Sequence, residues 1–264
     1  MNKNIMVLLI ICFITIFGAE TVYADSSFDT ENLDKGVVGA VYKSNSKLKI
    51  KITYKKESYT YNLNGEGTKE FFPLQMGNGS YKVSLYQNTA GSSYKLIESI
   101  NVDLNLDDQN VVYLGSTQNI NWELNPKTIK KAVELTKDTD NLEEKAKILW
   151  NFMIKNNEYD HKKLDKLPAT YLPIPDITLE EKTGICYDFS SLYASMLRSE
   201  GIPAKLVKGY APDYAKGYHA WNEVYDESKK EWFIIDSTYD IQLHSKKSVE
   251  MRKKAEKFKK VYEY

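Results

Sequence analysis

Cys186 is the residue of this chain best suited to covalent chemistry. The only other cysteine, Cys12, lies in an apolar N-terminal stretch with the pattern of a secretion leader, so Cys186 would have no disulfide partner once that leader is removed. Glycines at 184 and 201 bracket a predicted helix with Cys186 in its first turn. Free backbone N–H groups and the helix dipole there favour a thiolate and can hold an oxyanion. We expect Asp188, two residues on, to accept hydrogen bonds from backbone or loop donors.

A thiolate nucleophile needs a base, and the base needs an orienting group. Of the three histidines, His219 stands in an alternating stretch predicted as a strand over 218–225. A second predicted strand, 231–236, follows a turn, and a hairpin would bring position 219 opposite 236 or 237, with Asp236 beside His219. A slip of one residue would turn Asp236 to the other face. Each residue alone has an ordinary structural explanation, but the combination predicts a catalytic triad.

The motifs around these residues resemble the core of the transglutaminase-like superfamily. The resemblance implies a papain-like core in which Cys186 is the nucleophile, His219 the base and then the acid, and Asp236 the orienting group. Trp221 and Asn222 match family residues that follow the histidine and shape the site. The resemblance covers about 142–240 and is carried by the runs 184–189, 198–205, 209–210, 219–224 and 232–238.

Aromatic residues beside the triad could shield an acyl enzyme from water. Tyr218 and Trp221 flank His219, and the loop 211–217 could close over the site. Tyr159 corresponds to a family aromatic near the cysteine. Such shielding would let an amine compete with water through positioning.

The reaction that the resemblance implies is acyl transfer from a protein carboxamide of the glutamine type through a thioester, without a cofactor or a metal. An amine acceptor gives a cross-link, whereas water gives deamidation or amide cleavage. A cysteine protease or cell-wall amidase of the same fold is therefore an alternative. A non-catalytic secreted binding or adhesion module is another, and the reactivity of the thiol separates it from both enzymes.

The chain divides into three predicted segments. Residues 1–24 read as a signal peptide, with a retained anchor as the alternative, and they predict a secreted or cell-envelope protein. Residues 25–122 show the alternation and turn signals of an antiparallel, immunoglobulin-like β-sandwich, and 123–264 form the predicted catalytic domain. We thus predict an α+β fold, a papain-like transglutaminase core preceded by a sandwich. Strands are expected at 48–54, 81–85 and 100–104.

Helical periodicity begins after Asn125, where a proline follows a capping residue. A second helix is predicted to open at Asp140. We expect the proline-rich stretch 164–179 to be a loop. The lysine-rich tail 245–264 has a helical pattern, with an apolar stripe that should pack on the core.

The composition limits the possible partners. Lys and Arg number 36 and so do Asp and Glu, a balance that argues against a protein built to bind nucleic acid. No segment after the leader is apolar enough to span a bilayer. The acidic residues at 103–108 lack the spacing of a calcium-binding loop. We expect a monomer that acts on a protein or peptide substrate. That substrate can be associated with the cell envelope.

Overall fold

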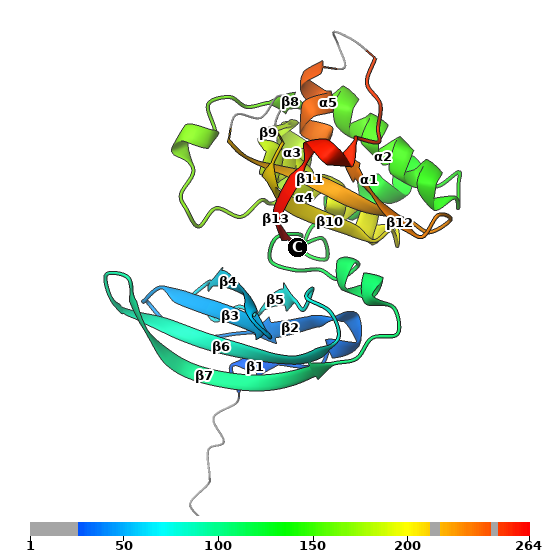
Figure 1. Ribbon diagram of the computed structural model, residues 1–264. Helices are drawn as coiled ribbons and strands as arrows, with labels where there is room; N and C mark the ends of the chain where they lie inside the picture. Colours follow the sequence, from blue (N-terminus) through cyan, green and yellow to red (C-terminus); the bar gives the residue numbers. More distant parts are fainter. Residues whose placement is uncertain (1–25, 212–216, 244–247) are drawn as a thin grey trace, which may run out of the picture.

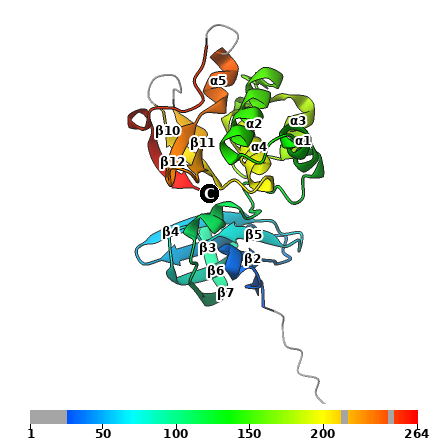
Figure 2. The ribbon, with the colours of Figure 1, turned by 90° about the vertical axis from the view of Figure 1, so that its right-hand side faces the viewer.

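The computed structural model describes residues 26–211, 217–243 and 248–264 (Figure 1). The predicted signal peptide, part of the loop 211–217 and the start of the tail lie outside the described residues. A β-sandwich forms the lower part in Figure 1, a mixed helix-and-sheet part lies above it, and the C-terminus lies at their junction. Figure 2 shows the same two parts from the side, with the helices on one side of the upper sheet.

The sandwich consists of two antiparallel sheets around one apolar core. Its strands alternate buried and outward residues, as in β3, where Leu48, Ile50 and Ile52 face the core. Side chains from both sheets join in one cluster, so the sheets pack face to face. One sheet has the order β1 (Phe28–Asp29), β2 (Val37–Ala40), β5 (Glu70–Pro73), and the other β4 (Glu57–Leu63), β3 (Leu48–Tyr54), β6 (Gly79–Ala90), β7 (Ser93–Leu104).

The upper part is built around helix α4 (Cys186–Ser199), which packs on an antiparallel sheet. Phe189, Leu192 and Met196 on α4 are fully buried, which explains the apolar periodicity of its sequence. The sheet order is β12 (Glu231–Ile235), β11 (Tyr218–Asp226), β10 (Ala204–Tyr210), β13 (Lys259–Glu263). The other helices are α1 (Pro126–Thr136), α2 (Leu142–Asn156), α3 (Pro175–Glu181) and α5 (Ser237–Leu243).

Short elements complete the chain. Strands β8 (Glu158–Tyr159) and β9 (Thr183–Gly184) pair in parallel just before α4. The 3₁₀ turns are η1 (Leu33–Lys35), η2 (Gln109–Tyr113), η3 (Leu164–Lys166) and η4 (Ala255–Lys257). The predicted α+β class, with an antiparallel sandwich ahead of a mixed helix-and-sheet core, is confirmed. Within the described residues, no helix has the length and apolar character that crossing a membrane would require.

The prediction of a helical tail is wrong over the residues described from 248 onward. The end of the chain forms β13, which pairs with β10 from Tyr210↔Lys259 to Val207↔Glu263. The edge of β10 offers unpaired backbone groups, and pairing with them outweighs the helical pattern of the tail. Phe258, expected on the helical stripe, packs instead on Trp221, with ring centroids 5.0 Å apart.

Three local predictions also need correction. The segment 164–179 is not all loop, because α3 begins at Pro175, a first-turn position that tolerates proline. Helix α2 is capped by Asn141 rather than by Asp140. The hairpin of β11 and β12 forms, but its register pairs Asn222 with Ile235, so position 219 lies beyond the end of the ladder rather than opposite 236 or 237.

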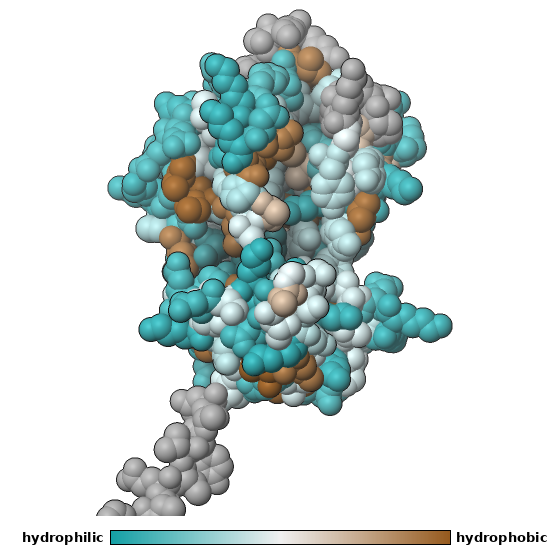
Figure 3. Space-filling view, turned by 90° about the vertical axis from the view of Figure 1, so that its left-hand side faces the viewer, coloured by the Kyte–Doolittle hydropathy of each residue, from teal (hydrophilic) through white to brown (hydrophobic). Residues whose placement is uncertain are grey.

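The two parts of the chain share a polar and aromatic junction. Arg198 of α4 donates to the carbonyl of Gly115 at 2.6 Å, and Asn119 donates to the hydroxyl of Tyr187 at 2.6 Å. The ring of Tyr264 packs against both apolar cores. Figure 3 shows the side of the molecule that lies on the left in Figure 1. That surface is mostly hydrophilic, with apolar patches in the upper body and at the base of the sandwich.

Candidate active site

Hydrogen bonds and an ion pair fix the start of α4, where Cys186 lies partly exposed. The carboxylate of Asp188 accepts the backbone N–H of Ile185 at 2.9 Å, as a first-turn acidic residue can. The hydroxyl of Tyr171 donates to it at 2.5 Å, and Lys163 Nζ lies 2.7 Å away. The expectation that Asp188 would accept backbone and loop donors is confirmed.

Gly184 allows this turn to close. A Cβ at position 184 would come within 2.8 Å of the Cβ of Asp188. Any side chain would therefore displace the carboxylate that fixes the start of α4.

His219 lies between Asp236 and Cys186. Its Nε2 is 2.8 Å from Oδ2 of Asp236, and both side chains are buried. The Cys186 side chain is the other group that interacts with the ring of His219. Burial lowers the pKa of His219, but the bonds to Asp236 and Cys186 raise it more, to about 10. A protonated imidazole is the state that accompanies a thiolate in a Cys–His pair.

The structure thus brings the three predicted triad residues together despite the altered register. Asp236 follows the last residue of β12 and caps α5, since its carboxylate accepts the N–H of Tyr239 at 3.0 Å. Asp236 lies one residue past the end of β12, so its carboxylate is not restricted to one face of the sheet. It can therefore reach His219 although the two residues are not paired in the ladder.

Asn222 and Trp221 support the site from β11. The amide of Asn222 donates to the carbonyl of Ser190 at 2.9 Å and to that of Lys205 at 3.0 Å, which ties α4 to the sheet. The ring of Trp221 is buried and stacked with that of His219, with centroids 6.3 Å apart. Asn222 thus connects α4 to the sheet and Trp221 packs on His219, whereas their role in shaping the site stays a prediction.

The two predicted tyrosines differ in position. Tyr218 is exposed, and its ring contacts Tyr210 with centroids 5.7 Å apart. Tyr159 pairs with Gly184 through β8 and β9, directly ahead of the cysteine. Burial, together with nearby Cys186 and Asp188, raises the pKa of Tyr159 to about 12, so its phenol stays protonated. Tyr159 is therefore a hydrogen-bond donor beside the reactive centre.

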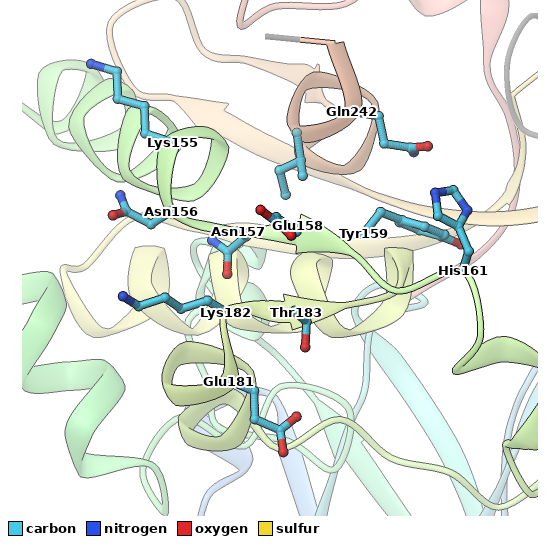
Figure 4. A pocket seen from close by; sticks show the side chains of 11 residues that line it. Lys155, Asn156, Asn157, Glu158, Tyr159, His161, Glu181, Lys182, Thr183 and Gln242 are labelled. Carbon is cyan, nitrogen blue, oxygen red and sulfur yellow. The ribbon is translucent and has the colours of Figure 1, made fainter. Parts of the chain in front are cut away.

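An open groove of about 860 Å³ runs along β8 and β9. Figure 4 shows Tyr159 and His161 together at one end and Lys155 and Asn156 at the other. Cys186 is not among its lining residues, so the groove adjoins the candidate site without containing it. Across the described residues, no three His, Cys, Asp or Glu side chains gather as a metal site would need.

Sequence reasoning missed Lys208 and Tyr187. Lys208 Nζ lies 3.6 Å from the ring centroid of Tyr187, the residue after the cysteine. The available signal was the alternation of β10, where Ala204, Leu206 and Lys208 share a face. The first two are core residues, so a lysine next in that series was predictable as an inward cation.

The fold and site define an α+β protein with a papain-like core and a cysteine at a helix start. Residues 129–237 match the transglutaminase-like superfamily. This segment, which holds Cys186 and His219, carries the transglutaminase-like core, and members of that superfamily are typically cysteine enzymes.

Curated relatives share parts of the chain. The uncharacterized protein YebA of Bacillus subtilis is 27% identical over 190 residues, which are 64% of this chain and 25% of that protein. A protein-glutamine gamma-glutamyltransferase of Pseudomonas aeruginosa is 32% identical over 88 residues, 29% of this chain and 13% of that protein. The chain therefore spans at most a quarter of the length of these relatives.

A solved structure from Cytophaga hutchinsonii, provisionally assigned as a cysteine protease, is similar with a TM-score of 0.48 and 17% identity. The match covers 85% of this chain and 73% of that one.

Proposed function

We propose that this chain is a thiol acyltransferase that uses Cys186, His219 and Asp236. One observation carries the proposal: a buried histidine bonded on one side to a carboxylate and on the other to a thiol at a helix start. This arrangement supplies a nucleophile, a proton carrier and an orienting group within one contact chain.

The steps follow from these positions. The Cys186 thiolate attacks the carbonyl carbon of a carboxamide, forming a C–S bond and an oxyanion. The backbone N–H of Cys186, at the first position of α4, is among the groups that a helix leaves without an internal acceptor and can donate to that oxyanion. His219 then gives its proton to the departing nitrogen, the C–N bond breaks, and a thioester remains.

The second half of the reaction reverses the proton movement. An incoming amine or water gives a proton to His219 while it attacks the thioester carbonyl, and the thiolate departs. An amine leaves a new amide, and water leaves a carboxylic acid. The glutamyl-transfer activity named for the Pseudomonas relative supports the amine route over the matched 88 residues.

The test is mass spectrometry of a glutamine-containing protein incubated with the purified chain and a labelled primary amine. We expect incorporation that disappears in Cys186→Ala and His219→Ala. The matched control is His161→Ala, because that ring lies in the neighbouring groove and should leave the rate unchanged. Deamidation or backbone cleavage alone at every amine concentration would assign the site to a hydrolase. Absence of all three in the unaltered protein, with an unreactive thiol, would support a binding module.

We also propose that the chain is exported and meets protein or peptide substrates outside the cytoplasm. The N-terminal sequence pattern carries this proposal. N-terminal sequencing of the protein recovered from the native host should show a chain that starts after Ala24. A chain that retains residue 1 in the cytoplasmic fraction would contradict it.

A further inference from the structure

A small cavity lies between the sandwich and the catalytic part. Its volume is about 140 Å³, the share of roughly four or five water molecules, which suits a short side chain or a chain end. Polar groups from both parts line it, among them Thr60, Asn62, Gln118, Tyr187, Lys208 and Tyr264. Cys186 is not among the lining residues; the link to it is Lys208, whose ammonium interacts electrostatically with Cys186.

Lys208 is the one positively charged residue among those lining the cavity. Its Nζ lies 3.6 Å from the ring centroid of Tyr187 and 5.2 Å from that of Tyr264, which is cation–π geometry. Its neighbour in β10, Gly209, pairs with His219 across the sheet. The ammonium is thus held at the end of the sheet where the triad lies.

Lys208 has no carboxylate partner among the described residues. The other lysine of β10, Lys205, is buried on the opposite face of the strand and pairs with Glu263 at 3.2 Å and with Glu223 at 3.8 Å. An ammonium has three donors, and ring faces do not replace the carboxylate that a partly buried cation ordinarily gains. Burial accordingly lowers the pKa of Lys208 to about 8, with nearby Cys186 acting in the opposite direction.

We infer that Lys208 receives a carboxylate of the substrate, so the acyl donor is a peptide with a free carboxylate close to the amide that Cys186 attacks. This inference rests on the proposed function and narrows its substrate class. A side-chain carboxylate and a terminal α-carboxylate present the same chemistry to the ammonium. Amide and hydroxyl groups from the sandwich side of the cavity would hold the rest of that residue.

Chloroacetyl peptides test the inference, because they alkylate Cys186 without requiring the natural substrate. One matched pair is chloroacetyl-glycine and chloroacetyl-glycinamide, which differ in a terminal carboxylate. The other is chloroacetyl-glutamic acid α-amide and chloroacetyl-glutamine α-amide, which differ in a side-chain carboxylate. The measured quantity is the ratio of acid to amide alkylation rates, divided by the same ratio for N-acetylcysteine methylamide.

In the unaltered protein we expect a normalised ratio of about ten for at least one pair, the order for one charge-assisted hydrogen bond. Lys208→Gln should bring the ratio to about one, and Lys208→Arg should keep part of it. Lys259→Gln removes the same charge from an exposed position on the adjacent strand and should leave the ratio intact. A ratio of one in the unaltered protein, or a high ratio that survives Lys208→Gln, would overturn the inference.

A second measurement separates this inference from the proposed function. If Cys186 reacts with no reagent, the nucleophile assignment fails, and carboxylate binding is then judged by calorimetry on Cys186→Ala with acetyl-glycine and acetyl-glycinamide, and with acetyl-glutamic acid α-amide and acetyl-glutamine α-amide. The acid of at least one pair should bind more tightly than its amide, and adding Lys208→Gln should remove the difference. Equal affinities within both pairs would refute the carboxylate site even where the thiol is reactive.

Discussion

Replacing Asp236 by asparagine should weaken the coupling between His219 and Cys186 while preserving the shape of the site. The substitution removes the charge from a buried contact of 2.8 Å. A hydrogen bond to a charged group contributes about 1.5–3 kcal/mol, and 1.36 kcal/mol corresponds to one pH unit. The pKa of His219, now about 10, should therefore fall by about one to two pH units. At such a pKa the imidazole is still mostly protonated near neutral pH, so the alkylation rate of Cys186 should change little there.

Nuclear magnetic resonance titration of the imidazole reports this pKa directly, since the chain has only three histidines to assign. The pH dependence of the free energy of unfolding reports the same pKa. A raised pKa contributes stability that is complete below 6.5 and is lost as the pH rises through about 10. The stability difference between the unaltered protein and Asp236→Asn should shrink across that window.

The matched control for this variant is Asp226→Asn. Asp226 is also buried, lies at the opposite end of the hairpin and pairs with Arg252 at 2.5 Å. It should lower stability without changing the titration of His219. The reasoning is refuted if Asp236→Asn leaves the pKa of His219 at its original value.

Three further outcomes are expected. Gly209→Ala should lower the midpoint of thermal unfolding, because its Cβ would come within 2.1 Å of the Lys259 carbonyl oxygen; an unchanged midpoint would contradict that close approach. Asn119→Ala should lower kcat/KM about fivefold by releasing the Tyr187 hydroxyl, a loss of about 1 kcal/mol, and Asn119→Gln, which keeps an amide donor, should restore part of it; an unchanged kcat/KM in Asn119→Ala would contradict this role. The fragment 25–122 should fold alone because its strands bury their own core, and a spectrum of an unfolded chain would show that it needs the catalytic part.

Local patterns in the sequence predicted several strands of the sandwich and the elements that carry the candidate triad. Alternation located β3, β6, β7 and β11, and the glycines at 184 and 201 bracketed α4. Each of these elements depends on interactions within one strand or helix and its immediate turns, and such interactions can be read from a short stretch of sequence. The roles of Cys186, His219 and Asp236 stay predictions, although the structure places them in contact.

Long-range pairing decided the features that the sequence did not reveal. The tail forms β13 because the edge of β10 has unpaired backbone groups. The sequence of the tail alone does not reveal that edge. The register of the hairpin depended on a loop two residues longer than a minimal turn. The cavity at Lys208 needs groups from residues 60 to 264, and only the folded chain brings them together.

Detection of the acyl enzyme tests the central claim most directly. The purified chain would be mixed with a glutamine-containing peptide, quenched in acid within seconds and digested for mass spectrometry. The account predicts an added acyl mass on the peptide that contains Cys186, removed by hydroxylamine and absent from Cys186→Ala. Turnover that persists in Cys186→Ala, or turnover without any adduct on this peptide in the presence of a slow acceptor, would contradict the account.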